Sequence, residues 1–186
     1  ISAYGIKADI VHVKDSKDEI KNNIKNFLQE YEVIIISGGV SKGDFDYVHE
    51  VLLELKVKKI FHGIYQKPGK PMWFGKYKKR TCVFALPGNP VSSFLCTCRY
   101  FLPYLQKSLG IICQKDVSNA LLKEELASHE TLTFFVQAQL STDAKWTLLA
   151  TPISHNGSGD FMSMVGADVF VELPPQKNSY KKGYVC

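Results

Sequence analysis

The segment EVIIIS, residues 32–37, constrains the fold of this chain more than any other stretch. It is a continuous apolar run of β-branched residues, as expected of a strand that is buried on both faces. Strands of this kind belong to parallel sheets that are covered by helices on both sides. The sequence therefore predicts an α/β domain that contains this strand.

Helical and extended patterns alternate around this segment. Apolar residues recur at helical spacing over 16–31, where Ser16 and Glu19 form a capping box at the start. A second helix follows the glycines after residue 37, and a third runs from about Val91 to Lys107. Further strands are predicted at residues 6–13, 57–66, 71–77 and 80–86. This order implies right-handed crossovers and a mostly parallel sheet with helices on its faces.

The pattern changes near residues 109–113, and no convincing helical period follows residue 117. Residues 131–140 and 145–153 are alternating or apolar, and Asp143 with Ala144 can form a turn between them. Residues 167–175 give another strand, which Pro174 and Pro175 end, and 157–165 a short irregular or helical piece. The sequence thus predicts an α/β domain at 1–108 and a small β domain at 112–186.

The charge distribution and the cysteine content limit the kinds of ligand and the cellular setting that we expect for this chain. The net charge is +5, and every charged residue from Lys56 to Arg80 is basic, which fits either a solvated face or an anion site. No nucleic-acid motif accompanies these charges.

The five cysteines form no C-x-x-C pair, so neither a zinc site nor a disulfide framework is indicated, and we expect a reducing, cytoplasmic setting. We find no signal-peptide or membrane-spanning pattern, and the start at Ile1 leads us to expect a piece of a longer protein.

The loop SGGVSKGDFDY, residues 37–47, is the first of three candidate site loops. Its glycines allow a ligand to approach the backbone, and its two acids can hold a cation that bridges to a bound anion. The alternative is a structural turn in which Asp44 only caps the next helix. The candidate residues are Ser37, Gly38, Gly39, Ser41, Gly43, Asp44 and Asp46.

The same loop also matches the G-x-S-x-G nucleophile elbow of α/β-hydrolases over residues 39–43, and His155 lies downstream. The hydrolase sheet needs several strands before the elbow, and only about two candidates precede it here. We therefore disfavour a serine hydrolase.

Residues 66–71, QKPGKP, form the second loop. Lys67 and Lys70 flank a turn at Gly69, so their ammonium groups can converge on one anion, although an ordinary basic turn would have the same residues. It is not a Walker A loop, because Pro71 stands where that motif has Ser or Thr.

The third loop is LPGNPVSS, residues 86–93. Two prolines make it rigid, and its N–H groups lie where a helix begins. Its candidate binding residues are Pro87, Gly88, Asn89, Pro90 and Ser92.

Together, SGGVSKGDFDY, KPGKP and FALPGNPVSSF, in this order, resemble the molybdopterin molybdotransferase (MoeA-like) family, which is similar also to the E domain of gephyrin. Residues 13–20 resemble the family upstream of the first loop, and 156–164 and 170–175 resemble parts of its C-terminal domain. The resemblance covers essentially the whole chain.

The resemblance implies a molybdopterin-binding, three-layer α/β/α domain followed by a small β-barrel domain. It implies insertion of molybdate into adenylylated molybdopterin with release of AMP, assisted by Mg²⁺, in a dimer. Asp44 and Asp46 match the acidic positions that would hold the metal and act in catalysis, and Lys67 and Lys70 match the basic pair near phosphate or molybdate. The glycine loop and the 87–90 loop match motifs around the pterin nucleotide.

The chain departs from the family in three respects. The family's first strand in this domain is absent before Ile1, as are its N-terminal domains, so we expect the chain alone to be inactive. Family arginines around 131–137 are also missing, which leaves their role in doubt. Two alternatives remain: a non-catalytic scaffold of the gephyrin type, and the related molybdopterin adenylyltransferase, against which the β domain argues.

Overall fold

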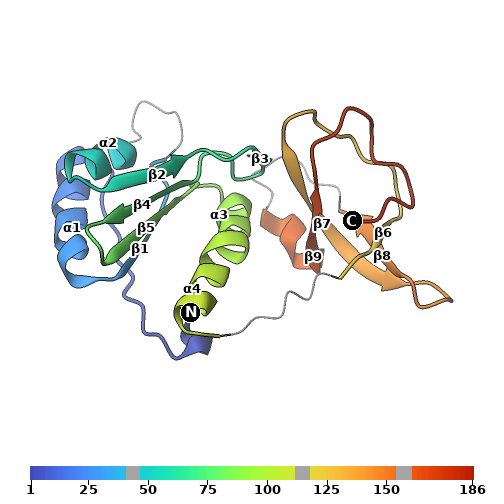
Figure 1. Ribbon diagram of the computed structural model, residues 1–186, viewed down its shortest axis with the longest axis horizontal. Coiled ribbons are helices and arrows are strands. Elements are labelled where there is room, and N and C mark those ends of the chain that lie inside the picture. Colours follow the sequence, from blue (N-terminus) through green and yellow to red (C-terminus); the bar gives the residue numbers. More distant parts are fainter. Residues whose placement is uncertain (41–46, 112–117, 154–160) are drawn as a thin grey trace.

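The computed structural model describes residues 1–40, 47–111, 118–153 and 161–186. These residues form an α/β domain and a smaller β domain beside it (Figure 1). No helix among them is both long and apolar enough to cross a membrane. The predicted fold class, an α/β domain followed by a β domain, is confirmed.

A four-stranded sheet forms the centre of the first domain, in the order β1 (Val33–Ser37), β5 (Thr81–Leu86), β4 (Trp73–Tyr77) and β2 (Lys58–His62). β1 pairs with β5 in parallel, whereas β4 is antiparallel to both of its neighbours. β1, β5 and β2 therefore run in one direction and end at the same edge of the sheet. The expected parallel character applies to these three strands, and β4 is the exception.

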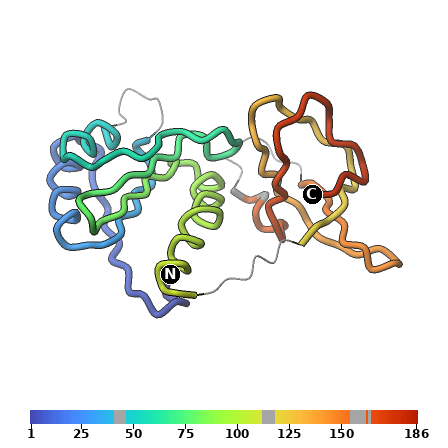
Figure 2. Tube along the Cα trace, viewed as in Figure 1, coloured from blue at the N-terminus to red at the C-terminus, as the bar shows by residue number. Residues whose placement is uncertain are grey.

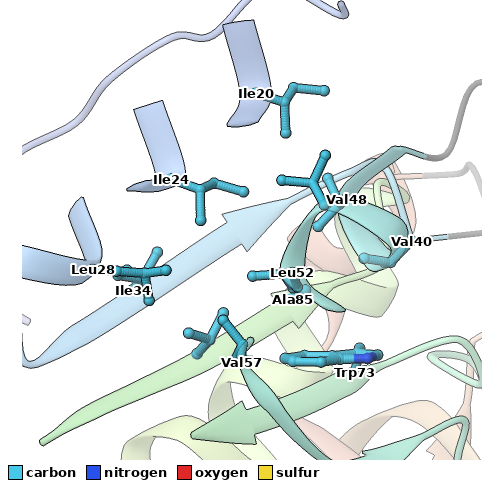
Figure 3. Close-up of a cluster of buried hydrophobic side chains, with 12 residues drawn as sticks. Ile20, Ile24, Leu28, Ile34, Val40, Val48, Leu52, Val57, Trp73 and Ala85 are labelled. Atoms are coloured by element: carbon cyan, nitrogen blue, oxygen red, sulfur yellow. The ribbon is translucent and has the colours of Figure 1, made fainter. Parts of the chain in front are cut away.

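Helices cover both faces of this sheet. α1 (Lys17–Glu30) and α2 (Tyr47–Glu54) pack on one face, and Figure 3 shows their apolar side chains meeting those of the strands. Half of the predicted capping box is present: the backbone N–H of Glu19 donates to Ser16 Oγ at 3.3 Å, whereas the N–H of Ser16 donates to the carbonyl of Lys14 at 2.8 Å and not to the Glu19 side chain. The buried residues of this cluster include Ile20, Ile24, Leu28, Ile34, Val48, Leu52, Trp73 and Ala85.

The helix predicted from Val91 to Lys107 is present but divided. α3 (Pro90–Cys96) and α4 (Leu102–Ser108) flank a π-helical turn, η2 (Thr97–Phe101), in which the N–H of Leu102 donates to the carbonyl of Thr97. Pro103 has no N–H and cannot donate to the preceding turn, which accounts for the irregular geometry there. These segments cover the second face, where they pack on Phe84 and Leu86.

One expected strand is wrong. Residues 6–13 adopt no regular structure, and η1 (Ser2–Tyr4) is the helical turn before them. A cavity of about 900 Å³ lies between this segment and β1, so the two do not form a ladder. Consequently β1 is not buried on both faces as expected: Ile34 is buried, but Ile35 is 37% exposed.

The second domain is built on the hairpin of β7 (Thr133–Thr142) and β8 (Leu148–Pro152), and the Asp143 side chain accepts hydrogen bonds from the N–H groups of Lys145 and Thr147 in the predicted turn. β9 (Val169–Leu173) pairs with β7, and β6 (Leu121–Leu122) with β8. The expected short piece is the 3₁₀ helix η3 (Phe161–Gly166), whereas residues 157–160 lie outside the described part. Closure into a barrel and the boundary at residue 112, which is not described, stay predictions.

Two residues of the first domain extend the sheet of the second. The predicted strand at 57–66 is split into β2 and β3 (Gln66–Lys67), and β3 pairs in parallel with the start of β7. The Cα trace in Figure 2 shows this segment reaching across to the β domain. Arg99 and Glu172 add an ion pair between the domains at 3.2 Å. The loop that contains the candidate residues Lys67 and Lys70 is thus tied directly to the second domain.

Candidate functional site

The glycine loop follows β1 at the edge where three strands end. Gly38 and Gly39 have φ angles of +94° and +68°, values that side chains rarely tolerate, which explains the paired glycines. The N–H of Gly38 donates to the carbonyl of Leu86, the last residue of β5, at 3.1 Å. Ser37 is exposed. Ser41, Gly43, Asp44 and Asp46, the other predicted residues of this loop, lie outside the described residues.

The loop after β5 touches the glycine loop. A Cβ atom on Gly88 would lie 3.4 Å from Cα of Gly38, so the two backbones pass close to one another. Asn89 caps α3, because its Oδ1 accepts from the N–H and the hydroxyl of Ser92 at 3.0 and 3.2 Å. Pro90 occupies the first turn of this helix, while Pro87 is buried. The predicted rigid loop is present, and it lies beside the first.

The loop over residues 66–71 contacts α3, the helix that follows the Pro87–Pro90 loop. Lys67 and Lys70 are exposed. The Lys67 Nζ lies 5.6 Å from the centre of the Phe134 ring in the second domain. Gly69, with a φ angle of +92°, lies against Cys96 and Ser92 of α3. The described parts of the other two motifs thus both contact the segment that starts with the Pro87–Pro90 loop: Gly38 lies beside Gly88, and Gly69 lies against Ser92 and Cys96 of α3.

We call residues 67–70 the lysine turn. Three residues that the sequence did not single out for the site contact this turn or one another next to it. Gln66, Cys96 and Tyr100 are linked by hydrogen bonds, and Gln66 is 1% exposed. No local sequence signal marks them, because the burial of Gln66 and its contacts with Cys96 and Tyr100 arise only in the folded chain. Burial raises the pKa of the Cys96 thiol to about 12, so this thiol is neutral at physiological pH.

A histidine pair, also not predicted, lies next to the start of α2. The rings of His49 and His62 are 4.7 Å apart, and His49 Nδ1 is buried without a hydrogen-bond partner. Burial lowers the pKa of His49, and the nearby His62 and Lys59 lower it further. Since His62 ends β2, the pair lies toward the same edge of the sheet as the glycine loop.

The described residues contain no group of three acidic, histidine or cysteine side chains that could hold a metal ion. The predicted magnesium site therefore depends on Asp44 and Asp46, which the structure does not describe. Carboxylate oxygens are ligands that Mg²⁺ accepts, so the residue types fit the ion.

The first domain matches, over residues 2–107, the family described as the probable molybdopterin binding domain. The second matches the MoeA C-terminal region, domain IV, over residues 119–186. The chain belongs to the MoeA-like family. This MoeA-like membership confirms the resemblance that the three sequence motifs indicated.

Named relatives agree with the MoeA-like assignment. A molybdopterin molybdenumtransferase from Synechocystis is 39% identical over 180 residues, which cover 94% of this chain and 42% of the relative. The molybdenum cofactor synthesis protein cinnamon of Drosophila melanogaster is 32% identical over 87% of this chain and 27% of its own length. A crystal structure of the molybdopterin biosynthesis MoeA protein from Pyrococcus horikoshii has a TM-score of 0.74 and 32% identity, covering 93% of this chain and 40% of that one. The chain thus spans less than half the length of these proteins.

Proposed function

We propose that this chain is the C-terminal half of a molybdopterin molybdotransferase, which inserts molybdate into adenylylated molybdopterin and releases AMP. One observation carries the proposal: the backbones of the glycine loop and the Pro87–Pro90 loop meet at the sheet edge, where Gly38 N–H bonds to Leu86 O at 3.1 Å. Ligands of open α/β sheets bind at such carboxyl ends of strands. The names of the relatives support transfer of molybdenum to molybdopterin, and the adenylylated substrate and the release of AMP are what the family resemblance implies.

The lysine turn has the charge that this reaction requires. Molybdate is a dianion and the nucleotide substrate has a diphosphate, so the two reactants repel each other. The exposed ammonium groups of Lys67 and Lys70 would reduce that repulsion and hold the oxyanions by charge-assisted hydrogen bonds. The dithiolene sulfurs of the substrate bind the metal, so no protein nucleophile is required, and catalysis rests on positioning and electrostatics.

Asp44 and Asp46 are the residues that would hold Mg²⁺, with Asp46 as the catalytic member and Asp44 as its helper or as a helix cap. When bound, the ion would neutralise negative charge on the phosphates. We further propose a cytoplasmic, homodimeric parent protein, as the resemblance implies. The match to the MoeA C-terminal region favours the transferase over the adenylyltransferase.

The test compares this 186-residue chain with a polypeptide of the relatives' full length that contains it. Both are incubated with adenylylated molybdopterin, molybdate and Mg²⁺, and AMP release is measured together with reactivation of a cofactor-free molybdoenzyme. We expect both signals from the long polypeptide and neither from the isolated chain. If the long polypeptide releases no AMP in response to molybdate, the proposed function is wrong. Normal turnover by the isolated chain would instead show that the remainder of the protein is dispensable.

A further inference from the structure

The Gln66 side chain makes contacts to the backbone of the lysine turn and to the helix that follows the Pro87–Pro90 loop. Its Nε2 donates to the carbonyl of Pro68 at 2.9 Å and to Cys96 Sγ at 3.8 Å, and its Oε1 accepts from the hydroxyl of Tyr100. The amide therefore uses its oxygen and both of its N–H groups. Rotating the amide by 180° would set its oxygen against the Pro68 carbonyl, so only one orientation satisfies all three partners.

The turn itself fits closely against this network. A Cβ atom on Gly69 would lie 2.7 Å from Gln66 Nε2 and 2.8 Å from Cys96 Sγ, which leaves room only for glycine. The neutral thiol of Cys96 also donates to the carbonyl of Gly69 at 3.9 Å. Two consecutive carbonyls of the turn, those of Pro68 and Gly69, are therefore held by buried side chains.

The π-helical turn η2 supplies the third member of the network. Tyr100 lies within it, between α3 and the helix turn that contains Pro103. π-helical turns inside α-helices occur frequently at functional sites. Here η2 presents the Tyr100 hydroxyl to Gln66. The helical segment that begins at the Pro87–Pro90 loop therefore also holds the lysine turn.

We propose that Gln66 is a positioning residue that fixes the Lys67–Lys70 turn on α3 and η2 and thereby sets its affinity for an oxyanion ligand. The choice of ligand rests on the proposed function, whereas the positioning rests on the contacts alone. Gln66 and Lys67 also pair with Thr133 and Phe134 of β7, so the start of the turn is held by the second domain as well. Gln66 is 1% exposed, so it would act through the two lysines and not by direct contact with the ligand.

The test replaces Gln66 by methionine, which keeps the length and volume of the side chain but removes its hydrogen bonds. Two amides report on the turn without any ligand, since Ile64 N–H donates to Lys70 O at 2.8 Å and Met72 N–H to Gly69 O at 3.2 Å. We expect hydrogen exchange at both amides to become about tenfold faster in Gln66→Met, the effect of losing one to two buried hydrogen bonds. Binding of molybdate and of AMP, measured by calorimetry on the same chain, should weaken about tenfold.

Gln106→Met is the matched control, because Gln106 Nε2 donates to the Tyr4 hydroxyl at 2.8 Å in α4, away from the turn. It should leave the exchange of both amides and both affinities unchanged. The double variant Gln66→Met/Tyr100→Phe removes both polar partners of one hydrogen bond, so it should regain thermal stability relative to Gln66→Met. The turn has still lost its anchor, so fast exchange and weak binding should persist.

The outcomes separate the two proposals. Unchanged exchange at Ile64 and Met72 in Gln66→Met overturns the positioning role, as does exchange that recovers with stability in the double variant. Faster exchange with unchanged affinities shows that the turn is held but does not set binding, which also overturns the proposal. If the unmodified chain binds neither molybdate nor AMP, the claim that Gln66 sets oxyanion affinity in this chain is overturned, and exchange alone then decides whether Gln66 positions the turn. The proposed function itself is decided separately, by AMP release from the long polypeptide.

Discussion

Gly39 lies so close to Val48 that a Cβ atom on the glycine would be 2.5 Å from Cγ2 of the valine. Real Cβ atoms do not approach other atoms to this distance, and Val48 is buried in the core between α2 and the sheet. Val48 also lines the cavity beside β1, but a contact of 2.5 Å could be accommodated only if the valine or the loop backbone moved. The glycine loop therefore depends on two properties of Gly39, its left-handed φ angle of +68° and its missing side chain.

We expect Gly39→Ala to lower the free energy of unfolding by roughly 2–5 kcal/mol, the sum of the strained φ angle and overpacking against Val48. Gly110→Ala is the control, because Gly110 has a similar φ angle of +71° but open space around it. It should cost only about 1–2 kcal/mol. Denaturant unfolding of both variants measures the difference, and equal losses would contradict the steric argument.

His49 makes stability depend on pH. Its pKa in the folded chain is lowered by burial and by His62 and Lys59, so the unfolded chain binds a proton more readily. Stability is therefore fully present above the ordinary histidine pKa of about 6.5 and decreases as the pH falls below it. We expect melting temperatures to decrease between about pH 7 and pH 5.

His49→Gln should flatten this decrease, whereas the exposed His12→Gln should retain it. The measurement is thermal unfolding of the three proteins at several pH values in one buffer series. If His49→Gln retains the full slope, another group is responsible for the pH dependence.

Most of the first domain could be predicted because its elements carry strong local signals. α1 has a capping serine and a regular apolar face, and β1 is a continuous run of β-branched residues. The segment 6–13 has the same kind of local signal and forms no strand, since a strand also needs a partner, and a cavity separates this segment from β1. Pairing between distant segments is not encoded in either segment alone.

Some residues of the candidate site could also be predicted from local sequence signals, and others could not. Gly38, Gly39, Gly69 and Asn89 could be singled out because positive φ angles and helix caps restrict the residue type. Gln66 could not be linked to Tyr100 from sequence, because the two are 34 residues apart and meet only through tertiary packing and a π-helical turn. Its neighbour Lys67 also pairs with β7 of the other domain, which no local pattern indicates.

The lysine turn gives a charge prediction. Lys67→Ala and Lys70→Ala should each weaken binding of molybdate or AMP about ten- to a hundredfold in the full-length protein, as expected for loss of one charge-assisted hydrogen bond. Lys58→Ala and Lys79→Ala remove exposed lysines elsewhere in the same basic stretch and should have little effect. Calorimetric titrations of the four variants at one ionic strength provide the comparison. Similar affinities in all four would mean that the turn is not the anion site.

The last prediction concerns the two acids of the first loop. Asp46→Asn keeps the side-chain volume and much of its hydrogen bonding but removes the charge, so it should depress turnover of the full-length protein without changing its melting temperature. Added Mg²⁺ should partly rescue this variant, because the substrate phosphates would still hold the ion. Asp44→Asn should have a weak effect, since Asn caps a helix about as well as Asp. Turnover is measured against Mg²⁺ concentration for both variants, with thermal melting as the control for folding. Normal turnover in Asp46→Asn would rule out its catalytic role, whereas a loss accompanied by a lower melting temperature would show that these acids only shape the turn.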